Sequence, residues 1–386
     1  MKCGFVEVLK SGTTLPDKMK PKIAHLTSVH PRWDVRVLYK ECVCLAKADL
    51  EVHLFVADGK GDEIIDGVEI HDLGVQHRNR FGRFLHTPNA LFRKAIKFDC
   101  TIYHIHDPEM LQVIPKLKNK KKITIYDIHE DVPRQILTKS YIPRYLRKII
   151  SVLFEKYENL IVKKVDFLIV TTPHIYNRFK KLNANTEIIR NYPINNFLIE
   201  GEKSVKRNEI CYFGGISYIR GINNILRAIS NIDVKLNLAG FFDSDKYKQQ
   251  LMSYPEWNKV IYHGILSKQE MQKLLAYSKI GLVTLLPMIN FIDALPVKMF
   301  EYMAAGVPVI ASNFPLWKEI VEGNNCGICV NPNDPSEIGR AISYLLENES
   351  IALEMGMNGR KTVIQKYNWD NEGKRLISIY SKLLEL

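Results

Sequence analysis

The segment Asp293-Ala-Leu-Pro-Val-Lys-Met-Phe-Glu-Tyr-Met-Ala-Ala-Gly-Val-Pro-Val-Ile-Ala311 decides the fold class of its part of the chain. Its first part predicts a helix beginning near Pro296, because proline is favoured in the first turn of a helix. Its last part, residues 307–311, is a short apolar strand. A strand that closely follows a helix is the repeating unit of a parallel α/β sheet.

The same alternation extends in both directions from this segment. Predicted strands cover residues 22–27, 51–57, 101–105, 122–128, 166–171, 187–190, 209–213, 235–239, 260–263, 280–284, 307–311 and 326–330. Predicted helices separate them, among them residues 35–48, 88–97, 110–117 and 143–164. Residues 191–208 have linker composition. The chain is therefore predicted to be α/β, with two doubly wound Rossmann-like domains facing a central cleft, and ligands are expected at the carboxyl ends of the strands.

The charge is concentrated in the first half of the chain. The net charge is +12, and residues 1–200 hold 33 basic and 23 acidic side chains against 21 and 19 in residues 201–386. This predicts an anionic partner for the first half, such as nucleic acid, an acidic membrane face or phosphates. Residues 76–97 and 139–164 mix basic with aromatic and aliphatic side chains, which favours a membrane surface, although a helix with one core-facing side has the same pattern. No zinc-finger, RRM or helix-turn-helix pattern is present, so nucleic acid is not the expected partner.

The cysteines and the lack of long apolar runs indicate the compartment. Seven cysteines at scattered positions predict reduced thiols in a cytoplasmic protein. The basic stretches at residues 76–97 and 139–164 add the expectation that it is peripheral on the inner face of the cell membrane. Cys326 and Cys329 have metal-site spacing, but no second pair follows, so a buried strand is favoured. No apolar run reaches the length of a membrane span. The first clear element follows Met19, which predicts Met19 as the start and residues 1–18 as an extension.

Two turns of the second half carry residues suited to an anionic ligand. Gly214 and Gly215 follow a strand and allow close backbone approach, and Arg220 adds a charge suited to phosphate. An ordinary turn with a solvated arginine is the alternative. Asp293 lies in a loop and Glu301 lies one to two helical turns further on, so both carboxylates can face one ligand. The alternative is an amphipathic helix with a capping acid.

The loop before the predicted helix adds donors to the same place. Amides near Leu295 and Val297, on either side of Pro296, lie at the positive end of the helix dipole and can hold a diphosphate, and Lys298 lies on the first turn. Asp243-Ser244-Asp245 resembles a metal-binding D-x-D, but its position before a helix favours capping.

Two strand ends of the first half are rich in histidines and acids. His104-Ile-His106-Asp107-Pro-Glu109 follows one strand, and Tyr126-Asp127-Ile-His129-Glu130-Asp131 follows the next. His106, Asp107 and His129 are candidate catalytic groups here, while buried, hydrogen-bonded histidines are the alternative. A third loop, Ser28 to Arg36, is a candidate acceptor or phosphate loop through His30, Arg32 and Arg36.

Residues 293–311 resemble the signature of GT-B glycosyltransferases of family 4, an E-x7-E pattern followed by small residues and G-x-PV-I-A, in the form found in bacterial surface-polysaccharide pathways. The first acid is Asp293 rather than glutamate. Gly214 to Gly221 resembles the family's G-R-L-x-x-x-K-G turn, with Gly215 at the arginine position and Arg220 at the lysine position. One of the two diphosphate cations is therefore replaced, and the candidate replacements are Arg32, Arg36 and Lys298.

The resemblance implies a role for each part of the site. The donor would be a nucleotide-sugar, by default UDP-linked, bound by the second domain, residues 199–366. Asp293 would hold the sugar, Glu301 the ribose, and His263 and Gly264 the base. The first domain, residues 20–198 with 367–386 crossing back onto it, would bind the acceptor, with His129 near the reacting carbon.

The resemblance also implies the reaction. The chain would be a retaining hexosyltransferase acting on a glycan or lipid-linked acceptor, and no metal or other cofactor is expected. The acceptor would attack from the face of the leaving group, and a donor phosphate oxygen would take its proton. The rival functions are a non-hydrolysing nucleotide-sugar epimerase and a non-catalytic glycosyltransferase-like binding protein.

Overall fold

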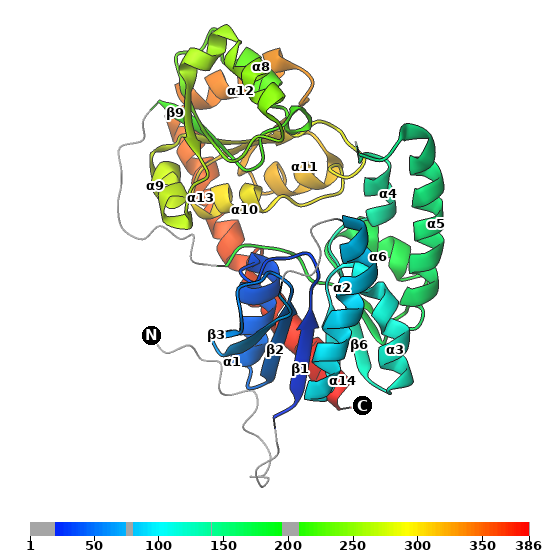
Figure 1. Cartoon of the computed structure of the whole chain (residues 1–386). Helices are drawn as coiled ribbons and strands as arrows, with labels where there is room; N and C mark the ends of the chain where they lie inside the picture. Colours follow the sequence, from blue (N-terminus) through cyan, green and yellow to red (C-terminus); the bar gives the residue numbers. More distant parts are fainter. Residues whose placement is uncertain (1–19, 75–79, 140, 195–207, 386) are drawn as a thin grey trace.

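The computed structural model describes residues 20–74, 80–139, 141–194 and 208–385, which form two α/β domains (Figure 1). The expected extension at residues 1–18 and most of the expected linker lie outside the described residues. The first sheet has the order β3-β4-β2-β1-β5-β6-β7-β8 and the second has the order β11-β10-β9-β12-β13-β14. All pairings are parallel except that of β3 with β4. The second order is that of a Rossmann sheet, and the prediction of two doubly wound domains is confirmed.

The strands are short and mostly buried. They are β1 (Lys22–Leu26), β2 (Glu51–Val56), β3 (Glu63–Ile65), β4 (Val68–Asp72), β5 (Ile102–Ile105), β6 (Ile123–Ile128), β7 (Phe167–Val170), β8 (Thr186–Ile188), β9 (Glu209–Phe213), β10 (Lys235–Ala239), β11 (Val260–Gly264), β12 (Ile280–Val283), β13 (Val309–Ser312) and β14 (Gly327–Val330). The hairpin of β3 and β4 was not predicted, because β3 is exposed and carries no alternating apolar pattern.

The helices cover both faces of each sheet. Those of the first domain are η1 (Val35–Cys42), α1 (Val43–Lys47), α2 (Arg80–Ala95), η2 (Ile96–Phe98), η3 (Pro108–Val113), α3 (Ile114–Asn119), α4 (Val132–Ile136), α5 (Arg144–Val162) and α6 (Pro173–Phe179). The later ones are η5 (Tyr218–Arg220), α7 (Ile222–Ala228), α8 (Asp245–Met252), η6 (Pro255–Lys259), α9 (Lys268–Tyr277), α10 (Val297–Ala304), α11 (Pro315–Val321), α12 (Pro335–Glu347), α13 (Glu349–Gln365) and α14 (Trp369–Leu384).

Three local predictions can be compared with these elements. The predicted helix 35–48 begins as a π-helix that Asp34 caps through the amides of Arg36 and Val37. The start predicted at residue 88 was wrong, because Pro88 lies inside α2. Ser244 caps α8 by accepting from the amide of Tyr247, which confirms the capping interpretation of that segment.

The terminal helix α14 lies against the first sheet, although the chain reaches it from the second domain (Figure 1). The indole of Trp369 donates to the carbonyl of Lys40 over 3.1 Å, and Leu376, Ile379 and Tyr380 join the apolar core of η1 and β1. Burying several large apolar side chains fixes this helix, at about 1.5–3 kcal/mol for each one removed from water.

Candidate active site

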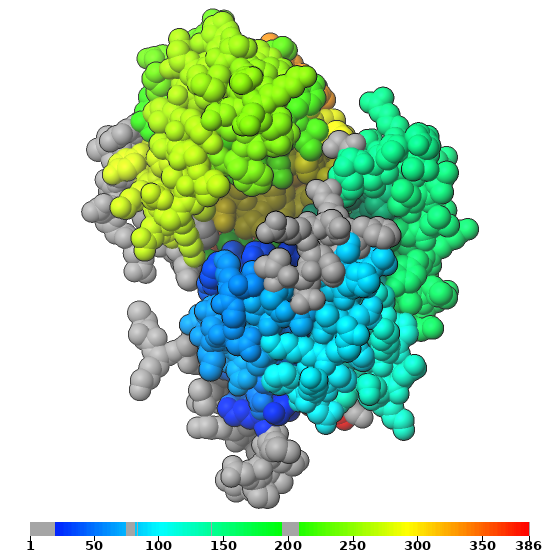
Figure 2. Space-filling model, viewed as in Figure 1, coloured from blue at the N-terminus to red at the C-terminus, as the bar shows by residue number. Residues whose placement is uncertain are grey.

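A cavity of about 450 Å³ lies between the two domains, at the recess visible between the lobes in Figure 2. The first domain contributes His30, Asp34, Val35, Arg36, His129, Glu130, Asp131, Arg134, Gln135, Thr171, Thr172, His174, Ile175 and Asn191 to its lining. The second contributes Arg220, Leu285, Ile289, Asn290, Phe291, Asp293, Ala294, Leu295, Pro296 and Trp317. The cavity thus lies beside the strand–helix turns where Rossmann-like domains bind ligands.

The turn after β9 is built for close approach of the backbone. Gly214 has a φ of +124°, and a Cβ on Gly240 would lie 1.8 Å from the carbonyl oxygen of Gly214. A Cβ on Gly214 itself would lie 2.9 Å from Nζ of Lys298. Glycine at position 214 therefore leaves the space that the end of the Lys298 side chain occupies.

Lys298 is a buried lysine without a hydrogen-bond acceptor among the described residues. Its Nζ lies 3.8 Å from the ring centroid of Tyr212, and the side chain comes from the first turn of α10. Burial and the nearby charge of Arg220 hold the pKa of Lys298 well below its usual range. An anion placed here would restore the charged ammonium and satisfy it.

The loop before α10 is held rigidly against the cavity. The buried indole of Trp317 donates to the carbonyl of Ala294 over 2.6 Å. Asp293 is about half exposed and lies 3.4 Å from Nδ1 of His174, a residue of the first domain. Leu295 and Pro296 line the cavity beside Arg220, whose guanidinium carbon lies 5.4 Å from the Phe291 ring.

The other predicted donor-side residues lie beside the cavity rather than in its lining. Glu301 is partly buried, and this burial raises the pKa of its carboxyl. The charges of Lys40, Lys298 and Lys268 act in the opposite direction but do not cancel the effect. His263 bonds to Oδ1 of Asn237 over 2.8 Å. Gly264 accepts from the amide of Gly240 over 2.7 Å, and Gly215 and Val297 flank the turns already described.

His129 reaches the cavity from the carboxyl end of β6. Its Nε2 lies 2.8 Å from Oδ2 of Asp127, and its side chain is 19% exposed. The ring of His30 lies 5.3 Å from that of His129 between centroids. Since Asp127 is an acceptor, Nε2 of His129 carries the proton, and Nδ1 is left as an acceptor.

His30 is a cationic group in the cavity at neutral pH. Its Nδ1 lies 3.2 Å from Asp34 and its Nε2 lies 3.4 Å from Asp107. Burial opposes the charged imidazolium, but the hydrogen bond to Asp34 and the charges of Asp107 and Asp34 outweigh it and raise the pKa of His30 to about 9.

Arg32 is not in the cavity lining, which corrects its assignment to the diphosphate, whereas Arg36 does line the cavity. Arg32 is buried, and its guanidinium bonds to Asp58 and Glu63 over 2.6 Å each. Arg36 lies in the cavity lining, but its guanidinium forms a bidentate ion pair with Asp127, with two hydrogen bonds of 2.9 Å. Both cations are neutralised within the first domain, and of the three candidates only Lys298 remains.

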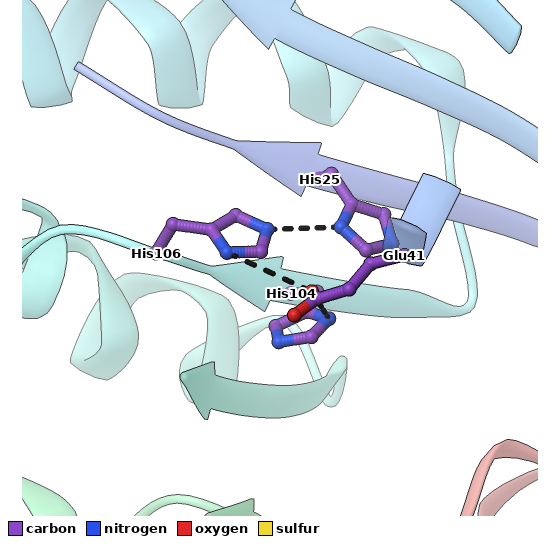
Figure 3. A group of neighbouring side chains, drawn as sticks. All are labelled: His25, Glu41, His104 and His106. Carbon is purple, nitrogen blue, oxygen red and sulfur yellow. Dashed lines mark hydrogen bonds and ion pairs between the residues drawn. The ribbon is translucent and has the colours of Figure 1, made fainter. Parts of the chain in front are cut away.

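His106 and Asp107 are not in the cavity lining, so their assignment as catalytic residues is corrected. Asp107 is buried and accepts from the hydroxyl of Thr27 over 2.7 Å and from the amide of Val29 over 3.1 Å. His106 is buried with His25, His104 and Glu41, and Figure 3 shows the three imidazoles gathered around the Glu41 carboxylate. Asp107 thus shapes the loop that carries His30.

One set of neutral histidines accounts for the hydrogen bonds among these rings, while both oxygens of Glu41 and Nε2 of His104 have no hydrogen-bond partner among the described residues. Nδ1 of His106 faces Asp127 at 3.7 Å, so it carries the proton, and Nε2 of His106 accepts from Nδ1 of His25 over 2.9 Å. Nε2 of His25 accepts from the hydroxyl of Tyr380 over 3.2 Å, and that hydroxyl accepts from His104 over 2.7 Å. The chain links α14 to the carboxylate that orients His129, so these histidines position the site without touching a ligand.

Of the two buried carboxyl groups Glu41 and Asp127, only one is protonated. Burial and the Asp127 charge raise the pKa of Glu41 well above its usual range. Burial opposes the ionised form of Asp127, but the charge of Arg36 and the hydrogen bond from His129 hold the pKa of Asp127 well below its usual range. Glu41 is therefore neutral, Asp127 is ionised, and the buried charge of Arg36 is balanced.

Sequence reasoning missed several residues of the cavity. His174 and Asp131 lie 3.5 Å apart, and Asp131 also pairs with Arg178 over 3.2 Å. His174 lies in the first turn of α6, a short helix after β7 that was not predicted, and its position near a strand end was the available signal. Trp317 was missed as a support because its partner, Ala294, contributes only a backbone carbonyl.

Two family models match the chain. Residues 195–362 match "Glycosyl transferases group 1", and residues 35–191 match "Glycosyltransferase Family 4". An uncharacterized glycosyltransferase of Methanocaldococcus jannaschii, MJ1178, is 24% identical over 87% of this chain and 91% of its own length. The MMP alpha-(1->4)-mannosyltransferase of Mycolicibacterium hassiacum is 22% identical over 43% of this chain and 41% of that enzyme, less than half the length of either.

Solved structures share the whole fold at low identity. The sucrose-phosphate synthase of Thermosynechococcus elongatus superposes with a TM-score of 0.76 at 18% identity, covering 95% of this chain and 100% of that one. The HepE protein of Anabaena, solved with UDP-glucose, gives a TM-score of 0.69 at 13% identity, with 94% and 99% covered. The arrangement of two domains around one cleft is common to all three.

Proposed function

We propose that this chain, a GT-B glycosyltransferase of the family 4 type, is a retaining enzyme. It would move a sugar from a UDP-linked donor to a hydroxyl of a glycan or lipid-linked acceptor. The product would belong to surface-polysaccharide synthesis. The observation that carries the proposal is Lys298, a buried cation-forming group that lacks an acceptor and lies beside the Gly214 turn. A diphosphate supplies the acceptor that this side chain needs. UDP is chosen because a solved neighbour contains UDP-glucose.

The donor would lie along the second domain from the base to the sugar. Its diphosphate would be held by Arg220, Lys298 and the first amides of α10, at the positive end of that helix. Asp293, in the cavity, would hold sugar hydroxyls, and Glu301 would hold the ribose. His263 and Gly264 would flank the base at β11. Each of these groups stabilises charge or position without moving during the reaction.

The acceptor would enter from the first domain beside His129. With its Nε2 proton directed at Asp127, His129 offers Nδ1 to a sugar or acceptor hydroxyl in the cavity. The acceptor oxygen would bond to the anomeric carbon on the face from which the bond to phosphate breaks. The acceptor proton would pass to a phosphate oxygen of the departing UDP, which Lys298 and Arg220 stabilise. Placement and leaving-group stabilisation would supply most of the acceleration.

A thermal-shift screen over nucleoside diphosphates and their sugars tests the donor assignment. Ligand at 100 times its Kd stabilises a protein by about 2.7 kcal/mol, which shifts the melting temperature measurably. UDP and one UDP-sugar are expected to stabilise, and failure of every nucleotide would overturn the proposal. Product analysis by NMR then separates transfer from epimerisation, because an epimerase converts the donor without an acceptor.

The charge of His30 predicts a pH dependence. The pKa of His30 is raised to about 9, so its imidazolium contributes stability that is complete below about pH 6.5 and is lost as the pH rises through about 9. We expect the melting temperature of the wild type, compared with His30→Gln, to fall over this interval. Gln keeps a hydrogen bond to Asp34 without the titration. Parallel curves for the two proteins from pH 6 to 10 would contradict the assignment.

The helix α5 presents an apolar stripe to solvent, at the edge of the first domain in Figure 1. Tyr145 is 77% exposed, Ile149 is 56% exposed and Leu153 is 61% exposed, one helical turn apart. Basic side chains, Arg144, Lys148, Lys156, Lys163 and Lys164, accompany them on exposed positions. These three side chains are separate from the core-facing side of the same helix, which carries Ile161 and Val162. The other basic stretch, residues 76–97, lies partly outside the described residues, and no described helix is long and apolar enough to span a bilayer.

We propose that this stripe docks on an anionic membrane, where a lipid-linked acceptor would be found. Co-sedimentation with phosphatidylglycerol vesicles is expected for the wild type and should weaken with salt, since each basic residue near the surface adds about 1 kcal/mol. Serine at positions 145, 149 and 153 together should abolish it. The matched control is Ile265→Ser, which removes an exposed apolar side chain from the second domain. Equal sedimentation of the triple variant would refute the docking surface.

A further inference from the structure

Two histidines and a glutamate meet on one face of the first sheet, outside the cavity lining. His53 lies on β2, and Glu69 and His71 lie on the parallel strand β4, with His53 in register with Glu69. Nδ1 of His53 lies 3.0 Å from Nε2 of His71 and 3.3 Å from Oε2 of Glu69. Nε2 of His71 lies 3.7 Å from the same oxygen. Each residue therefore presents one and the same atom to both of the others.

These separations suit ligands of a single metal ion. A tetrahedral zinc ion with bonds of about 2.0–2.1 Å places its ligand atoms about 3.4 Å apart. The three distances in the cluster, 3.0, 3.3 and 3.7 Å, bracket that value. An ion at the centre of this triangle would contact all three atoms with little movement of the side chains.

The outer nitrogens of both histidines face carboxylates, as in many zinc sites. Nε2 of His53 lies 3.0 Å from Oε1 of Glu51, and Nδ1 of His71 lies 3.8 Å from Oδ2 of Asp62. Carboxylates in these positions keep the protons on the outer nitrogens and direct the inner lone pairs at the metal.

The residues around the cluster supply negative charge, an apolar surface and access from solvent. Three carboxylates face the cluster, from Glu51, Glu69 and Asp62, while Lys22 pairs with Glu51 and Lys94 with Asp62. The Phe98 ring of η2 packs on both imidazoles, at 5.2 Å from His53 and 4.4 Å from His71 between centroids. The Glu69 side chain is 47% exposed, so one side of the cluster is open to solvent.

The buried histidines of Figure 3 do not have this geometry. His106 uses Nε2 toward His25 and Nδ1 toward Glu41, so its two neighbours do not converge on one atom. The guanidinium of Arg36 also lies 2.9 Å from Glu41 and would repel a cation. That group is a hydrogen-bond network, and the two clusters can be told apart by experiment.

We propose that His53, His71 and Glu69 bind a divalent transition-metal ion of the zinc class, with its fourth position open to solvent. Two imidazoles and one carboxylate are ligands that zinc accepts. The ion would join β2 to β4 and so stabilise the edge of the first sheet that carries the β3–β4 hairpin. It lies outside the donor site and takes no part in the transfer.

The test is a titration of the tag-free, chelator-treated full chain with Zn²⁺ by calorimetry and with Co²⁺ by visible absorption. One ion per chain is expected, with the intense d–d bands of four-coordinate cobalt and a higher melting temperature in zinc. Glu69→Gln, an exposed position that does not endanger folding, should weaken binding at least tenfold. Glu51→Gln should weaken it about 10- to 100-fold, as removal of a carboxylate behind a histidine does elsewhere.

The matched control is Asp66→Asn, which removes a carboxylate from the turn of the same hairpin. Asp66 has a φ of +50°, a conformation that asparagine tolerates. This variant should bind zinc like the wild type. The proposal is overturned if the wild type binds no ion, if Glu69→Gln and His53→Gln bind like the wild type, or if Asp66→Asn loses binding equally.

Discussion

Lys298→Met is expected to lower kcat by about 100- to 1,000-fold, the usual effect of removing one group that stabilises a developing negative charge. At the same time the melting temperature of the free protein should rise. The reason is that a buried lysine without an acceptor opposes folding, whereas methionine fills the same volume beside Tyr212 without a polar atom. Steady-state kinetics and thermal unfolding of the same preparation measure the two effects.

A matched variant separates this effect from general loss of charge. Lys273→Met removes an exposed lysine from α9 in the same domain and should leave both quantities unchanged. If Lys298→Met were fully active, or less stable than the wild type, Lys298 would not be the group that holds the leaving diphosphate.

Asp127→Asn is expected to lower the free energy of unfolding by about 3–5 kcal/mol, because removing one partner of a buried ion pair leaves the other uncompensated. Asp127 accepts two bonds from Arg36 and one from His129, and both of these side chains depend on it for position. Urea unfolding measures the loss, and transfer should fall as His129 loses its orientation.

Glu41→Gln is the control for this prediction. Since the raised pKa of Glu41 keeps its carboxyl neutral, an amide of the same shape should change stability little. In the double variant the two changes should not be additive, because Glu41 can ionise and replace the lost charge only when it is still an acid. If the Glu41→Gln protein were as unstable as the Asp127→Asn protein, the assignment of the negative charge to Asp127 rather than Glu41 would be wrong.

The sequence predicted the sheets better than the site. Strands such as β7 and β12 are continuous apolar runs, and that pattern follows directly from burial on both faces. The β3–β4 hairpin was not predicted because its edge strand is polar. The predicted helix was shorter than α2 because Pro88, the predicted helix start, lies inside α2. These failures come from tertiary context, which allows exceptions to local preference.

The candidate site was predicted by location but only partly by role. Turns at strand ends identified Arg220, Asp293 and His129, and these three line one cavity. The pattern could not show which cations are already paired, and so it ranked Arg32 and Arg36 with Lys298. Pairing depends on acids distant in sequence, such as Asp58 and Asp127. The hydrogen bonding of His25, the partner of His106, likewise depends on Tyr380, which arrives on the last helix.

The central claim is that Lys298 and the Gly214 turn hold the diphosphate of the donor, and calorimetric titration with uridine, UMP and UDP tests it most directly. We predict that affinity rises sharply at UDP, that Lys298→Met removes this rise, and that UDP binding to the wild type takes up a proton. The proton is expected because an anion returns the lowered pKa of Lys298 toward its usual range. Equal affinity for uridine and UDP, or a rise that survives in Lys298→Met, would contradict the account.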